Sequence, residues 1–476
     1  MVFPNRSFYV IGTLSTRGNQ SNRNRSLEAP RVLVFIQIVI EITDSIVKMI
    51  LLIAILCAPH VIALPPSCDS PVYCYGDVLH AVQMARVFDD GKTFVDLKMK
   101  HSQDVVLENF ARLQNPTKEE IVQFVNDNFE RGNELENHTL IDFNPDLPWI
   151  QEISNETVRT FTKDLLNIWP QLARKVKSEV FDNVDRYSFI PVPNAFVIPG
   201  GRFLEYYYWD SYWIVEGLLI SEMYETARGM IDNFISIVDK YGFIPNGGRI
   251  YYLQRSQPPL LTPMAFLYLQ HTKDTAWVKN NIRILEKELE YWKRQSLPVS
   301  VNGQISYTMY HYDAPSDGPR PESYREDYLT ANYWDDEAKR EEVYVDLKSG
   351  AESGWDFSAR WVFDDKGGNV ANLSHIQTRR VVPVDLNAFL CGAYRDIAEM
   401  YAVLGKFRAH HKWYNKYLAL REAIDVVLWN EDDGIWYDYD VNESKHRKMF
   451  YPSNVTPLWS KCFYPDRVNI KNVLNR

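Results

Sequence analysis

Residues 199–213 read PGGRFLEYYYWDSYW, a Gly-Gly turn followed by charged and aromatic side chains. Glycines permit backbone conformations closed to other residues, which suits a loop that wraps closely around a ligand. Aromatic rings offer apolar faces to sugar C–H groups, while arginine and carboxylate groups bind hydroxyls through charge-assisted hydrogen bonds. The alternative is a turn leading into a buried aromatic helix, which applies above all from Tyr206 onward. Arg202 and Asp210 favour the functional interpretation, because charged residues are rarely interior without a partner or a role.

Composition describes an acidic globular protein. The chain has 476 residues, 46% of them hydrophobic and 24% charged, with a formal net charge of −10. This length allows a large core, and the negative charge argues against a nucleic acid as partner. The 29 Tyr and 13 Trp residues suit contacts with carbohydrate.

The first 63 residues are expected to precede the folded domain. Residues 1–48 form an N-terminal extension whose polar first part is predicted to be disordered. Lys48 precedes an apolar run, and Val61 and Ala63 fit a signal-peptidase site, so residues 49–63 are predicted to be a signal peptide. The protein is therefore expected to be secreted. If the leader stays uncleaved, residues 49–64 could instead anchor the protein to a membrane.

Sequons and cysteines agree with an oxidising, extracellular compartment. Cys68 and Cys74 are close together in SCDSPVYC and could close a small disulfide loop, whereas Cys391 and Cys462 cannot be paired from sequence. Glycosylation acceptor motifs occur at Asn137, Asn155, Asn372, Asn442 and Asn454.

Helical periodicity dominates from about residue 75, and strand alternation is scarce. We expect a helical hairpin over residues 211–241 with a break near Gly229, and further pairs joined by loops rich in Gly, Pro and aromatics. Residues 64–476 are interpreted as one catalytic-type domain, all-α, resembling an α/α toroid with its site on the loops of one face. The helical segments are predicted at 77–87, 118–130, 158–180, 211–241, 263–271, 275–295, 384–404 and 406–428, the last two joined at Gly405.

Further loop stretches share the character of residues 199–213. Residues 245–259 read PNGGRIYYLQRSQPP, residues 320–322 read RPE, and residues 352–361 read ESGWDFSARW. A carboxyl held against a Trp in a poorly solvated pocket can have its pKa raised to roughly 6, which suits Asp356 as a general acid.

Each of these stretches also has a structural alternative. The charges of RPE could form a solvated ion pair, Asn246 could shape a turn, and Asp356 could cap a helix. Their joint occurrence on loops between helices favours a site.

These four stretches resemble, in the same order, the signatures of the α,α-trehalases of glycoside hydrolase family 37. The resemblance covers about residue 68 to the end, and the leader and Cys68–Cys74 region resemble secreted animal, insect-like members. It implies an (α/α)6 barrel that hydrolyses trehalose to two glucose molecules with inversion, using water as nucleophile and no metal or organic cofactor. Asp356 would be the general acid. The glucose subsites would be lined by Arg202, Trp209, Asp210, Asn246, Arg255, Ser256, Gln257, Arg320, Glu322 and Gly354.

The sequence departs from the family where the general base is expected. In the family this base is a Glu in a Gly-rich stretch near the C-terminus, after a signature built around Gln-Trp-Asp, and this chain has neither stretch. We therefore expect the barrel to be incomplete at its C-terminal helices, with the base outside this chain. Glu352 and Glu322 do not carry the base's motif. The alternative function is then an inactive isoform that at most binds trehalose.

Overall fold

The computed structural model describes residues 68–475 apart from 302 and 304. The predicted extension (1–48) and signal peptide (49–63) lie outside the described residues. Every described helix is too short or too polar to cross a bilayer.

The first helices of the described chain pack around a smaller apolar cluster, which also includes Tyr207, Tyr251 and Tyr252. Within it, Phe129 contacts Phe94 and Phe124 edge to face. A capping box in which Thr117 and Glu120 bond each other's backbone amides begins one of these helices. The elements are α2 (Asp77–Met84), α3 (Lys92–Val95), β1 (Lys98–Met99), α4 (Gln103–Ala111), α5 (Lys118–Asn128) and β2 (Phe129–Glu130).

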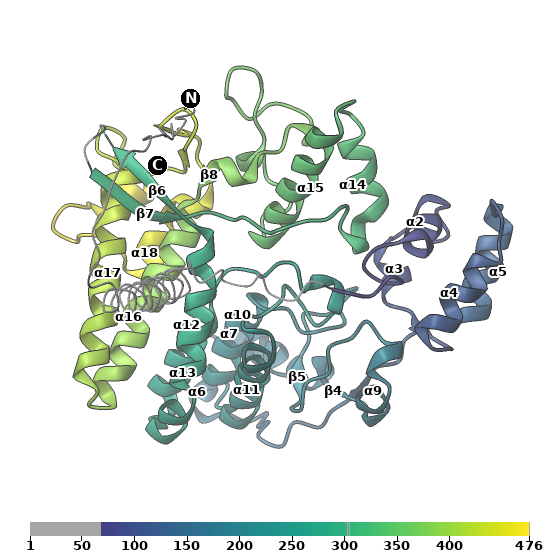
Figure 1. Cartoon of the computed structure of the whole chain (residues 1–476). Helices are drawn as coiled ribbons and strands as arrows, with labels where there is room; N and C mark the ends of the chain where they lie inside the picture. The colour runs from purple at the N-terminus through teal and green to yellow at the C-terminus, as the bar shows by residue number, and fades with distance from the viewer. Residues whose placement is uncertain (1–67, 302, 304, 476) are drawn as a thin grey trace, which may run out of the picture. The chain divides into compact units, whose positions relative to one another are not determined.

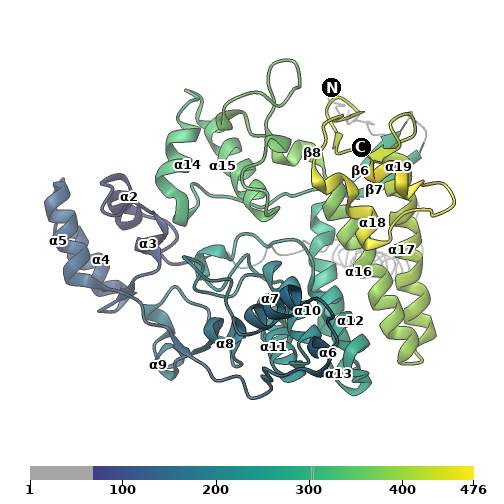
Figure 2. The ribbon, with the colours of Figure 1, turned by 180° about the vertical axis from the view of Figure 1, so that it is seen from behind.

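The larger core is built from consecutive helix pairs, in which each helix contacts the next (Figures 1 and 2). The first helices of three pairs, α10, α12 and α16, contact one another in that order, and α11 contacts α13. This arrangement confirms the predicted all-α class. The pairs are α10 (Asp210–Ile220) with α11 (Tyr224–Tyr241), α12 (Leu261–Thr272) with α13 (Thr275–Tyr291), α14 (Tyr324–Ala331) with α15 (Glu337–Glu352), and α16 (Val384–Val403) with α17 (Phe407–Val427).

Local sequence explains where these helices begin and end. Asp274 and Asp336 accept backbone N–H bonds as the N-caps of α13 and α15. Gly242, with φ of 84°, ends α11, and Gly405, with φ of 67°, joins α16 to α17 as predicted. Helix α16 is buried along nearly its whole length, as a helix with apolar residues on all faces must be.

The single helix predicted over 158–180 is wrong. The chain there forms α7 (Glu156–Leu166), α8 (Trp169–Leu172), β4 (Ala173–Val176) and α9 (Ser178–Asp182). Strand β4 pairs with β3 (Leu135–Asn137) and β5 (Phe196–Val197). Pro170 lacks the N–H needed to continue α7, and pairing with β3 and β5 then satisfies the backbone.

The break predicted near Gly229 lies elsewhere. Helix α10 ends at Ile220, and Glu222 takes a left-handed φ of 58° before α11 begins. Gly229 lies inside α11, where an added Cβ would stand 3.3 Å from Cβ of Asn194. This glycine therefore permits a close approach and does not end a helix.

Short elements complete the described chain. The β6–β7 hairpin was not predicted; its strands pair from Ser296 with Tyr310 to Val301 with Ile305. The remaining α-helices and strands are α6 (Pro148–Gln151), β6 (Ser296–Val301), β7 (Ile305–Tyr310), β8 (Val381–Val382), β9 (Trp429–Asn430), β10 (Ile435–Trp436), β11 (Tyr439–Asp440), β12 (Lys445–His446), α18 (Thr456–Ser460) and α19 (Ile470–Leu474).

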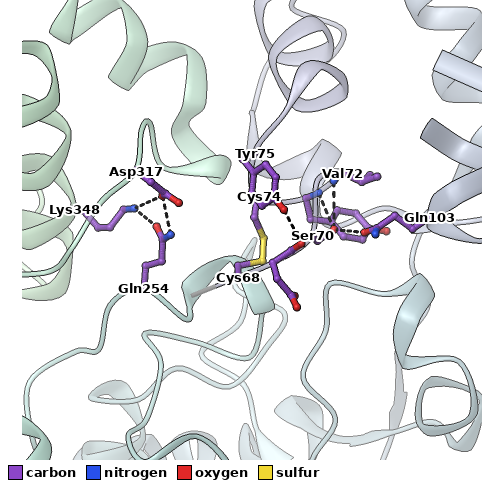
Figure 3. The surroundings of a disulfide bond; sticks show 11 residues. Cys68, Ser70, Val72, Cys74, Tyr75, Gln103, Gln254, Asp317 and Lys348 are labelled. Carbon is purple, nitrogen blue, oxygen red and sulfur yellow. Dashed lines mark hydrogen bonds and ion pairs between the residues drawn. A yellow bond between two sulfur atoms is a disulfide. The ribbon is translucent and has the colours of Figure 1, made fainter. Parts of the chain in front are cut away.

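Two disulfides link the described cysteines. Cys68 pairs with Cys74, as predicted, with Cα atoms 5.9 Å apart (Figure 3). Cys391 pairs with Cys462, with Cα atoms 6.2 Å apart, and ties α16 to the segment that follows α18. Only the fold brings this second pair together, because 71 positions separate the two residues in sequence.

Candidate active site

Arg255 lies at the centre of the predicted site and joins two of its loops. The buried guanidinium donates from Nε to Oδ1 of Asn246 (3.0 Å) and from Nη2 to Oε1 of Glu322 (2.8 Å). The Asn246 amide in turn donates to the Arg255 carbonyl (3.1 Å). Asn246 therefore does more than shape a turn, since both its backbone and its side chain orient Arg255.

The RPE triplet is not a solvated ion pair. Arg320 is buried and forms a bidentate pair with Asp327 on α14, both contacts at 2.8 Å, while Glu322 pairs with Arg255. Burial raises the pKa of Glu322, but Arg255 and Arg320 outweigh it, and the pKa is lowered overall. Arg320 precedes the short helix η4 (Pro321–Ser323) and Glu322 lies within it, and the two side chains pair with different residues.

The opening motif contributes Trp209 and Asp210 at the start of α10. The Trp209 amide donates to Oε1 of Gln257 (3.2 Å). Gly354, with φ of +74°, packs against the indole so closely that a Cβ would lie 2.5 Å from Cζ2 of Trp209. Asp210 is half-buried, and burial raises the pKa of its carboxyl. The structure therefore brings Trp209, Gln257 and Gly354 together.

All four tyrosines of the motif belong to the core, as the structural alternative expected. Tyr206, Tyr207, Tyr208 and Tyr212 are buried. The Tyr208 hydroxyl donates to Glu288 (2.8 Å). These rings pack into the apolar clusters of the protein.

Arg202 lies apart from these contacts. Its side chain is 58% exposed and pairs with Asp90 (3.3 Å) at the edge of a cavity of about 990 Å³. Asp90 precedes Gly91, where a Cβ would stand 3.0 Å from the Glu322 carbonyl oxygen. The Asp90–Gly91 segment therefore connects Arg202 to the loop that carries Glu322.

Asp356 follows α15 and does not cap a helix. The next turn, η5 (Ala359–Trp361), is capped by Ser358, whose Oγ accepts from the Arg360 amide. Asp356 is accessible to solvent. Desolvation raises the pKa of Asp356, and the nearby Arg320 and Arg255 oppose this rise. A carboxyl whose pKa is raised by burial, in spite of nearby cations, suits a general acid.

A buried cluster of ion pairs holds this loop, and the sequence motif shows only its arginine. Arg360 is fully buried and forms bidentate pairs with Asp385 and Asp438, all four contacts between 2.8 and 3.0 Å. Its guanidinium also stacks on Trp355, 5.2 Å from the ring centre. Because Asp356 follows Trp355, this cluster fixes the loop that carries the acid. The Arg in ESGWDFSARW was the only visible signal, and its partners lie far along the chain.

Ser256 uses its polar atoms to hold its own loop. Its hydroxyl donates to the Ile244 carbonyl (2.6 Å), and its amide donates to Oε1 of Glu352 (2.8 Å).

Within the part of the chain that the structure describes, no group of three His, Cys, Asp or Glu side chains is arranged to hold a metal ion.

Comparisons with known proteins show which family the chain resembles. The family described as Trehalase matches residues 86–476. The trehalase of Tenebrio molitor is 52% identical over 403 residues, covering 84% of this chain and 73% of the relative. The trehalase of Bombyx mori is 46% identical (83% and 69% covered), and that of Homo sapiens 45% (84% and 69%).

Among solved structures, the neutral trehalase Nth1 from Saccharomyces cerevisiae aligns with a TM-score of 0.48 and 23% identity. The alignment covers 59% of this chain and 54% of that one. The family match and the identities to curated relatives together show that this chain belongs to the trehalase family.

Proposed function

We propose that this protein is a glycoside hydrolase that cleaves trehalose into two glucose molecules with inversion, using Asp356 as general acid. The observation that carries the proposal is the position of Asp356, a carboxyl of raised pKa near Arg320 and Arg255, on a loop that packs against Trp209 through Gly354. The trehalase relatives supply the substrate.

The chemistry follows from these groups. Asp356 would donate its proton to the glycosidic oxygen, so the departing glucose leaves as a neutral alcohol. In an inverting enzyme, a water attacks the opposite face of the sugar, activated by a second carboxylate roughly 6.5–9.5 Å from the acid. Arg255, Arg320 and Asp210 offer charged partners to sugar hydroxyls, and Trp209 offers an apolar face.

Glu322 and Glu352 are unsuited to the role of base. Glu322 is buried against Arg255 (2.8 Å), and Glu352 is buried and accepts from the Ser256 amide (2.8 Å). Each carboxylate has one oxygen bonded to a site loop, and its other oxygen is buried without a hydrogen-bond partner in the described chain.

Trehalose binding without turnover is therefore the second candidate function. Glucose release and trehalose affinity, measured on the same preparation, separate the two. Binding with release close to that of a full-length relative supports hydrolysis. Binding with a rate lower by at least about 10²–10⁴-fold, the usual contribution of a general base, supports the second candidate. A chain that is folded but neither binds nor cleaves trehalose would refute both.

We also propose that the protein is secreted and glycosylated. Two disulfides, Cys68–Cys74 and Cys391–Cys462, fit an oxidising compartment. The exposed sequon residues are Asn137, Asn155, Asn372 and Asn442. Secretion into the medium of a eukaryotic expression host, with loss of residues up to Ala63, tests this proposal. Retention in the membrane fraction would support the anchored alternative.

A further inference from the structure

Helix α15 carries two buried charges one turn apart. Lys348 and Glu352 are 2% and 0% exposed, and Glu352 is the last residue of the helix. Burying a charge costs free energy unless partners replace water, and a carboxylate at a helix C-terminus also opposes the helix dipole. Burial therefore disfavours both residues here, the helix dipole also disfavours Glu352, and their contacts must explain them.

Lys348 holds the residue before Arg255. Its ammonium donates to Oε1 of Gln254 and lies 4.0 Å from Oδ1 of Asp317, and Gln254 Nε2 also donates to Asp317 (2.8 Å). Figure 3 shows the three side chains converging. Lys348 thus ties α15 to both the Gln254 loop and the segment that leads to Arg320.

Glu352 holds the residue after Arg255. Its Oε1 accepts from the Ser256 backbone amide (2.8 Å). Its other oxygen, Oε2, has no hydrogen-bond partner within the described chain. Ser256 precedes Gln257, which accepts from the Trp209 amide (3.2 Å). The contact between Glu352 and Ser256 is therefore connected to Trp209 through Gln257.

We propose that Lys348 and Glu352 are positioning residues, which hold the 254–257 loop on both sides of Arg255 at a fixed distance from the loop bearing Asp356. The inference deepens the proposed trehalose-cleaving function and rests on it. The chain order supports this proposal, because α15 ends at Glu352 and the loop with Gly354 and Asp356 follows directly. One rigid helix thereby sets the spacing between the sugar-binding arginine and the acid. Neither residue is assigned contact with the substrate.

Both residues lie among other charged and titratable groups. Arg255 stands near Lys348, so removing the charge of Lys348 would also change the electrostatic field at Arg255. The groups facing Glu352 are Arg294, Asp313, Tyr291 and Tyr312, and those facing Lys348 are Asp317, Arg255, Glu322 and Asp327.

The first experiment compares E352A, E352Q and the control E286Q in the full chain. Glu286 is also buried, but its carboxylate accepts from Trp413 Nε1 (2.8 Å), away from the site. We expect E352A to speed amide hydrogen exchange in the peptide 253–258 and to weaken trehalose affinity, or kcat/KM, by about 10- to 100-fold. E352Q should restore both, because its amide oxygen can accept from Ser256. E286Q should change neither.

The second experiment compares K348M with K339M on the same helix. Lys339 lies on the exposed part of α15 and pairs with Glu342 (2.8 Å). K348M should speed exchange in the same 253–258 peptide and weaken affinity, whereas K339M should do neither. The proposal is overturned if E352A and K348M leave exchange and affinity unchanged, if E352Q behaves like E352A, or if a control weakens affinity equally.

The exchange measurement needs no sugar. It therefore decides the positioning role even if the parent chain neither binds nor cleaves trehalose, a result that would refute the proposed function alone.

Discussion

Gly354 and Trp209 lie in contact across the site, so close that a Cβ on Gly354 would stand 2.5 Å from Cζ2 of the indole. Gly354 belongs to the loop that carries Asp356, and Trp209 adjoins the first residue of α10. This contact sets how near the Asp356 loop lies to Trp209 and Asp210. Both the missing side chain and the left-handed φ of +74° require glycine here.

We predict that G354A lowers trehalose affinity or kcat/KM by about 10- to 100-fold, because the added methyl must displace the indole or the acid loop. The matched control is G367A, since Gly367 has φ of +76° with nothing within 4 Å of its Cβ. Both variants carry the same backbone strain, so calorimetric titration with trehalose isolates the contact. Equal affinity losses in the two variants would contradict the prediction.

D356N should abolish most turnover while leaving trehalose bound. An amide cannot donate a proton as an acid does, so the rate should fall by about 10²–10⁴-fold relative to the same chain with Asp356. The test is made in a chain that shows measurable glucose release, with D365N at an exposed neighbouring acid as control. Retention of most activity in D356N would rule out Asp356 as the general acid.

Glu352 should make folding stability depend on pH. Burial is the main cause that raises the pKa of Glu352 from 4.5 to about 6. A raised carboxyl pKa means that its stabilising contribution is present below 4.5 and is lost as the pH rises through about 6. E352Q should therefore be more stable than the wild type at pH 7 by about 2 kcal/mol, with the difference gone near pH 4.

Denaturant unfolding at several pH values measures this difference. A stability gain for E352Q that does not change between pH 4 and pH 7 would show that titration of Glu352 is not its source.

Removing the long-range disulfide should destabilise the fold more than removing the short one. Cys391–Cys462 spans 71 positions and Cys68–Cys74 spans 6. The loop-entropy model gives about 4 kcal/mol for the first and about 2 kcal/mol for the second. Thermal unfolding of C391A/C462A and C68A/C74A checks the order. The reverse order would contradict the entropic account.

Four of the five sequons should carry glycans. The exception is Asn454, which is 1% exposed, accepts from the Tyr451 amide (2.8 Å) and donates from Nδ2 to the Trp436 carbonyl. A glycan needs that same Nδ2, so modification is incompatible with the folded position. Glycopeptide mass spectrometry of the secreted protein checks each site, and an occupied Asn454 would refute the prediction.

Helix existence could largely be predicted from sequence, because the apolar pattern of a helix is local. The 406–428 segment, for example, agrees with α17 (Phe407–Val427) to within a residue at each end. The prediction failed at 158–180, where β4 pairs with β3 and β5 from elsewhere in the chain. Strand pairing depends on partners that local periodicity cannot show.

The sequence by itself determined the residue types of the site and the family they indicate. Only the tertiary structure decided which charges meet. Arg320 and Glu322, two positions apart, turn away from each other to Asp327 and Arg255. Arg360 forms ion pairs with Asp385 and Asp438, and Cys391 forms a disulfide with Cys462. The physical reason is that a buried charge or thiol takes whichever partner the packed helices bring within bonding distance, and sequence separation does not enter that choice.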